Sequence, residues 1–113
     1  MAAIANLTID QGATFSSDVT VKDANGNAFD LTGYTASAKM AKGFQSTKTR
    51  TSITCTIQAP ATNGLVTLSL TADQTTALDD GRYVYDLEIL QTSSSTVTRV
   101  IEGIITVRPQ VSI

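Results

Sequence analysis

Hydrophobic and polar residues alternate along residues 82–89. One face carries the hydrophobic side chains of Tyr83, Tyr85, Leu87 and Ile89, and the other carries the charged side chains of Arg82, Asp86 and Glu88. Because successive side chains of a β-strand point to opposite sides of a sheet, this alternation predicts a half-buried strand. Gly81 lies just before it, in a turn that Asp79 and Asp80 can close through side-chain hydrogen bonds to the backbone.

The same pattern predicts strands along most of the chain. They are expected at residues 4–10, 14–22, 34–42, 50–58, 66–70 and 97–108. Asn25 and Gly26 predict a tight hairpin turn, since both residues tolerate positive φ. Thr71 and Gln74 match a capping box, which predicts one short helical turn near residues 72–78. Seven or eight short strands separated by turn signals predict an all-β fold, an antiparallel β-sandwich.

The turn and strand at residues 79–85 carry a more specific pattern. Asp79, Gly81, Tyr83 and Tyr85 resemble, in order and spacing, the D-x-G-x-Y-x-C signature of immunoglobulin-like sandwiches. In that family the first Tyr forms the tyrosine corner, so these four residues are expected to define the fold. Tyr85 stands where the family has Cys, so the resemblance is to the immunoglobulin-like fold and not to disulfide-bonded antibody domains.

Length and composition fit one domain over residues 1–113, with residues 1–8 either a strand or an extended arm. Hydrophobic residues make up 42% of the chain, which is ordinary for a globular domain. Cys55 alternates with Ile53 and Ile57 and is expected to be a small buried residue of a strand. We expect no signal peptide and no membrane segment, and therefore synthesis in a reducing cytoplasm.

The residues that usually carry catalysis are scarce. The chain has no His, which rules out Ser-His-Asp and Cys-His arrangements and His metal sites. The adjacent Asp79 and Asp80 are interpreted as turn residues, and Asp23, Asn25 and Asn27 as a hairpin rather than a calcium loop. We therefore expect no enzyme, no cofactor and no metal.

Basic residues gather in the middle of the chain, because no acidic residue lies between Asp30 and Asp73. The candidate docking surface consists of Lys39, Lys42, Phe44, Lys48 and Arg50. Phe44 would be its apolar anchor, and the basic groups would set the register. An ordinary solvated loop is the alternative. The net charge of −2 and the single interleaved aromatic argue against a nucleic-acid partner.

The end of the chain offers a second candidate surface. In the last strand, Val97, Ile101, Ile105 and Val107 are expected to share the core side, which leaves other hydrophobic residues on the outside. The candidate subunit contact consists of Val100, Ile104, Val111 and Ile113. Either these residues are buried against another subunit, or a neighbouring loop covers them.

Four segments together resemble a group of immunoglobulin-like virion proteins of tailed bacteriophages. These segments are Asp30–Tyr34, Gly64–Thr71, Asp80–Ile89 and Arg99–Val107. Their layout is similar to that of the N-terminal domain of phage baseplate upper proteins. The resemblance implies a structural virion component, a decoration, cement, connector or baseplate protein that docks on capsid or tail subunits in a symmetric assembly. The alternative is a recognition module for a host carbohydrate or receptor, against which the absence of Trp weighs.

Overall fold

The structure is a computed structural model that describes residues 3–42 and 50–109. Within these residues it contains eight strands, one short α-helix and one 3₁₀ turn. In chain order they are β1 (Ala3–Ile4), β2 (Leu7–Asp10), β3 (Phe15–Thr20), β4 (Tyr34–Ala41), β5 (Thr51–Ile57), the 3₁₀ turn (Ala61–Asn63), β6 (Leu65–Leu70), α1 (Ala72–Thr76), β7 (Gly81–Gln91) and β8 (Thr96–Arg108).

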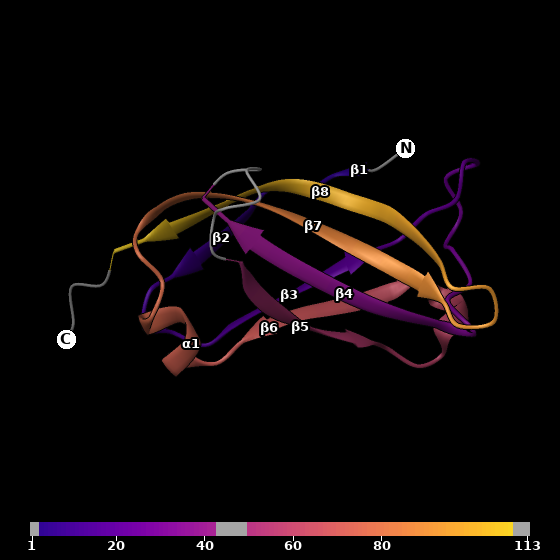
Figure 1. The fold of residues 1–113 in the computed structure, drawn as a ribbon, viewed down its shortest axis with the longest axis horizontal. Coiled ribbons are helices and arrows are strands. Elements are labelled where there is room, and N and C mark those ends of the chain that lie inside the picture. Colours follow the sequence, from indigo (N-terminus) through magenta and orange to yellow (C-terminus); the bar gives the residue numbers. More distant parts are fainter. Residues whose placement is uncertain (1–2, 43–49, 110–113) are drawn as a thin grey trace.

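The strands form two packed layers (Figure 1). One layer follows the order β1–β8–β7–β4, with β2 also paired to β8, and the other follows β3–β6–β5. Strand β5 joins the layers, because its first residues pair with β4 and Thr54–Ile57 pair with β6. Neighbouring strands run antiparallel except β1 and β2, which run parallel to β8. The predicted immunoglobulin-like β-sandwich is confirmed.

The core lies between the layers and is built from the alternating residues that the sequence pattern places inward. The most deeply buried side chains come from both layers and include Ile9, Val66, Leu68, Leu87 and Ile105. On β7, the inward residues Tyr83, Tyr85, Leu87 and Ile89 are all buried. The charged residues between them therefore face away from the core.

Local hydrogen bonds form the expected turns. The Tyr83 hydroxyl donates to the Asp79 carbonyl at 2.9 Å, the geometry of a tyrosine corner, and Gly81 between them has a φ of 122°. The Thr71 hydroxyl accepts the Gln74 backbone N–H, and the Gln74 side chain accepts the Thr71 backbone N–H, which completes the predicted capping box. These turns fix how the chain enters β7.

The last strand differs from the expectation at its start. Leu87 pairs with Ile101 while Glu88 pairs with Arg99, so Val100 is an extra residue, a β-bulge. The extra residue shifts the alternation of β8 by one position. Residues before Val100 that would have shared a face with Ile101 therefore point to the opposite face. Val97 is therefore 58% exposed instead of sharing the core side with Ile101, and that prediction was wrong.

Hydrogen bonds and a close backbone approach at Gly103 hold the N-terminal segment against β8. The Tyr85 hydroxyl donates to the Ala5 carbonyl at 2.6 Å, and the Ile104 backbone N–H donates to Asn6 Oδ1 at 3.0 Å. A Cβ on Gly103 would lie 2.2 Å from the Ala5 carbonyl oxygen, so the close approach requires glycine. Ala3–Ile4 and Leu7–Asp10 thus pair with β8 as parallel strands.

Candidate functional site

The outer side of the layer formed by β1, β8, β7 and β4 carries charged and exposed hydrophobic groups. We name this surface the β8–β7–β4 face. Strand register places its residues, which include Ile4, Lys39, Val84, Asp86, Glu88, Leu90, Val97, Arg99, Glu102 and Ile104. Within residues 3–42 and 50–109, the large hydrophobic side chains that remain exposed are Ile4 (76%), Val97 (58%) and Ile104 (39%). All three lie on this face.

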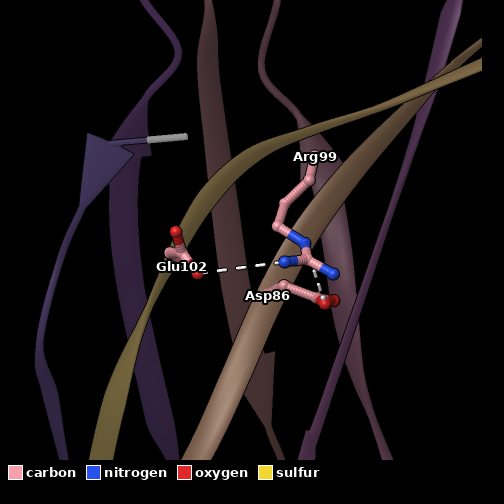
Figure 2. Close-up of polar contacts among 3 residues, drawn as sticks. All are labelled: Asp86, Arg99 and Glu102. Atoms are coloured by element: carbon pink, nitrogen blue, oxygen red, sulfur yellow. Dashed lines mark ion pairs between the residues drawn. The ribbon is translucent and has the colours of Figure 1, made fainter. Parts of the chain in front are cut away.

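An ion-pair cluster occupies the centre of the face. Arg99 Nε lies 3.3 Å from Asp86 Oδ2, and one of its terminal nitrogens lies 3.9 Å from Glu102 Oε2. Figure 2 shows the Arg99 guanidinium between the two carboxylates, which come from β7 and β8. The side chains are partly exposed, so each pair contributes only about 0.2–1 kcal/mol to stability. The cluster matters more as a fixed pattern of charge on the surface.

A hollow of about 250 Å³ opens on the same face beside β4 and β7. Its lining includes Lys39, Ala41, Arg50, Val84, Asp86, Glu88 and Arg99. The structure thus brings together Lys39 and Arg50, two members of the candidate docking surface. It also places acidic residues of β7 among them, in register with β4, so Lys39 lies opposite Asp86. The surface is therefore of mixed charge. The sequence around Lys39 and Arg50 did not indicate this, because the acidic residues come from a distant segment.

The third described member of the candidate docking surface points elsewhere. Lys42 Nζ donates to the Asp80 carbonyl at 2.8 Å and lies 5.1 Å from the centroid of the Tyr83 ring. Lys42 thus contacts the turn before β7 rather than the hollow that Lys39 lines. Phe44 and Lys48 lie outside the described residues.

The candidate subunit contact is divided as well. Val100 is partly buried and packs against the core, because the bulge turns it away from the outer face, so the expectation that it lies on the outer face was wrong. Ile104 is exposed on the β8–β7–β4 face. Val111 and Ile113 lie outside the described residues.

The opposite side of the sandwich has a different chemistry. Its outward residues along β3, β6 and β5 are mostly hydroxyl-bearing, namely Ser16, Thr20, Thr54, Thr56, Thr67 and Ser69. Asp18 is the acidic residue among them, and it accepts a hydrogen bond from the Thr67 hydroxyl at 2.6 Å. We name this surface the β3–β6–β5 face. Its small polar groups make it a solvated surface, in contrast to the aliphatic and charged β8–β7–β4 face.

A second hollow, of about 360 Å³, lies at the end of the sandwich near the bulge. Its lining includes Phe29 and Tyr34, whose rings pack edge to face with centroids 5.4 Å apart. Lys22, Asp23 and Thr98 supply polar groups around this aromatic pair. Aromatic surface beside a few polar groups is typical of small-ligand sites.

Cys55 is only partly buried, and its thiol donates to the Ile53 carbonyl at 3.5 Å. Burial raises the pKa of this thiol to about 11, well above its ordinary value. The thiol therefore stays protonated near neutral pH, and the protonated form is a poor nucleophile. Within the described residues, no group of three or more His, Cys, Asp or Glu side chains is arranged to hold a metal ion. None of the described helices is long and apolar enough to cross a membrane.

Comparison with solved structures finds domains of similar fold. The N-terminal domain of phage TP901-1 ORF48 superposes with a TM-score of 0.56 at 10% identity, over 92% of this chain and 85% of that one. The Lin-41 filamin domain gives 0.47 at 19% identity (89% and 82% covered), and Listeria monocytogenes InlP gives 0.48 at 14% identity (92% and 26% covered). No protein-family profile and no curated relative matches the sequence. At these identities the likeness concerns the fold alone.

Proposed function

We propose that this protein is a non-catalytic structural component of a tailed-phage virion that docks on other virion subunits through its β8–β7–β4 face. One observation carries the docking role, the contrast between the two outer surfaces. The exposed large hydrophobic residues Ile4, Val97 and Ile104 all lie on the β8–β7–β4 face, whereas the β3–β6–β5 face is mostly hydroxyl-bearing. Exposed aliphatic groups set among charges are characteristic of protein-binding surfaces.

Two further observations support the virion setting. The order of segments along the chain resembles that of immunoglobulin-like virion modules, and a solved phage domain shares the fold. Such a protein acts by surface complementarity, so the hydrophobic side chains supply affinity and the surrounding charges select the partner and the register.

The direct test is to locate the protein in purified particles. Full heads and tails are separated, and each fraction is probed with an antibody against the chain. We expect signal in one fraction, at high copy number for a decoration or cement protein and at low copy number for a connector or baseplate protein. Absence from both fractions would refute the virion role.

A pair of variants tests the face itself. Ile104→Lys introduces a charge on the β8–β7–β4 face, and Thr56→Lys introduces the same charge on the β3–β6–β5 face. We expect the first to lower incorporation into particles by about tenfold or more, because it buries an unpaired charge in the contact. The second should leave incorporation unchanged, and both should keep their unfolding temperature. Equal incorporation of the two variants would exclude this face as the contact.

The second hollow favours one alternative, a recognition module for a host carbohydrate or receptor. Phe29 and Tyr34 offer an aromatic surface, and Lys22 and Asp23 offer polar groups beside it. A glycan array with the purified chain tests this alternative. Specific sugar binding that is lost in Tyr34→Ala would favour recognition over docking, and a blank array would leave docking as the better account.

A further inference from the structure

The charges of the β8–β7–β4 face are arranged in an order that complements itself. One row of paired residues, which we call the central rung, crosses the three strands. It consists of Lys39 on β4, Asp86 on β7 and Glu102 on β8, because Lys39 pairs with Asp86 and Asp86 pairs with Glu102. Arg99 lies between the two acids, 3.3 Å from Asp86 and 3.9 Å from Glu102, so Asp86 is the more closely paired of the two. The rung therefore has a basic group at the β4 edge and an acidic group on β8.

We infer that the β8–β7–β4 face binds a second copy of this chain, through a two-fold axis that runs parallel to β7 between the two sheets. Such an axis places β4 of one copy over β8 of the other, and it leaves β7 over β7. Lys39 of each copy then faces Glu102 of its partner, which gives two identical ion pairs. This inference uses the face of the proposed function and names its occupant.

Shape agrees with charge in the same arrangement. Ile104 projects from β8, two residues along from Glu102, and the hollow of about 250 Å³ opens beside β4 and β7 at Ala41 and Val84. With β8 of one copy over β4 of the other, Ile104 of each copy enters the hollow of its partner. The lining of the hollow is largely charged, but Ala41 and Val84 offer apolar contact to this side chain, whose burial supplies the hydrophobic contribution that exposed ion pairs lack.

The other simple two-fold arrangement is disfavoured by the same residues. An axis in the plane of the contact but perpendicular to the strands places each strand over its own copy. When it passes through the central rung, Lys39 meets Lys39 and Glu102 meets Glu102, which is repulsive. Ile104 then faces β8 of its partner and misses the hollow. Charge order and shape thus select the axis parallel to β7.

Charge reversal tests this contact in the purified full chain. Sedimentation velocity over a concentration series gives the dimer dissociation constant of the unmodified protein, of Lys39→Glu, of Glu102→Lys and of the double variant. We expect each single reversal to weaken the dimer by about tenfold or more, since it acts at both symmetry-related pairs. The double variant should recover to within about threefold, because it restores opposite charges across the axis.

Matched controls isolate the contact. Lys22→Glu and Asp18→Lys make the same charge changes outside the β8–β7–β4 face, and they should leave the dissociation constant unchanged. A chain that stays monomeric to about 100 μM, a concentration at which weak dimers (Kd near 1 μM) are already formed, would overturn the inference. So would a dimer that is insensitive to both single reversals. Failure here is separable from failure of the proposed function, since a monomer found in particles leaves the virion role standing, and a dimer absent from particles leaves the two-fold contact standing.

Discussion

Replacing Gly103 with Ala tests the close approach that holds the N-terminal segment against β8. An added Cβ would lie 2.2 Å from the Ala5 carbonyl oxygen and 3.1 Å from Asn6 Oδ1, so the first strand must move away from β8. The contacts at risk are the Tyr85 hydroxyl bond to Ala5, the Asn6 bond to the Ile104 N–H and the Ala5 N–H bond to the Glu102 carbonyl. At about 0.5–1.5 kcal/mol each, their loss lowers the free energy of unfolding by about 2–4 kcal/mol.

The sign of the effect is informative. Without the clash, Gly→Ala within a strand would stabilise the protein by about 0.4–1 kcal/mol, because it restricts the unfolded chain. Urea unfolding followed by circular dichroism measures the difference, and for a urea slope of about 1–3 kcal/mol/M the midpoint should fall by roughly 0.7–4 M. A midpoint that rises or stays the same would refute the close approach of Ala5 to β8.

A double-mutant cycle with Tyr85→Phe identifies the cause. In the unmodified chain this change removes the bond to Ala5, so it should cost about 1 kcal/mol. In the Gly103→Ala background the bond is already lost, so the same change should cost much less. Additive effects of the two changes would mean that Gly103 acts elsewhere than through the N-terminal segment.

Three further predictions concern the bulge, a buried phenol and the helix cap. Ile101→Ala should cost about 2–5 kcal/mol in urea unfolding and Val97→Ala under about 0.5, because only Ile101 is buried; equal costs would contradict the bulge. Burial raises the pKa of Tyr85 from 10.0 to about 12. The stability that the protonated Tyr85 phenol contributes is therefore fully present below pH 10 and is lost as the pH rises toward 12. Tyr85→Phe should reduce the fall of the unfolding temperature between pH 10 and about 12. An unchanged fall would argue against a role of Tyr85 ionisation in this pH dependence. Thr71→Ala removes the cap of α1 and should lower the free energy of unfolding by about 1 kcal/mol in urea unfolding. Thr54→Ala, at an exposed strand position, should lower it by less.

The proposed function rests on a property of surfaces rather than on a catalytic group. The β8–β7–β4 face combines exposed aliphatic residues with a fixed ion-pair cluster and a hollow. These features together suit recognition of another protein surface, where aliphatic groups supply affinity and charges supply specificity. The particle assay and the sedimentation assay examine the two proposals separately.

Much of the fold was predictable because strand structure has a short-range signature. Alternation with a period of two identified β7 and its buried face, and the resemblance of residues 79–85 to the immunoglobulin-like signature implied the corner ahead of it. The capping box at Thr71 and the turn at Asn25–Gly26 depend on neighbouring residues only, so they too could be read from the chain. Each of these features is decided within a few residues.

The composition of the candidate site was less predictable. Lys39 and Arg50 could be singled out from the sequence, but their acidic neighbours on β7 could not, because strand pairing brings them together from a distant segment. The bulge at Val100 was also missed, since no residue type in β8 marks where an extra residue is inserted. It moved Val97 outward and turned Val100 toward the core.

Local sequence pattern was enough to predict which residues face the core within most strands, where the chain turns, and that the fold is a sandwich. The tertiary structure alone decided which strands are neighbours, and hence that Lys39, Asp86 and Glu102 share a rung and that Gly103 makes room for Ala5. The physical reason is range. Alternation and turn chemistry act between adjacent residues, whereas strand order and register follow from packing both layers around one core.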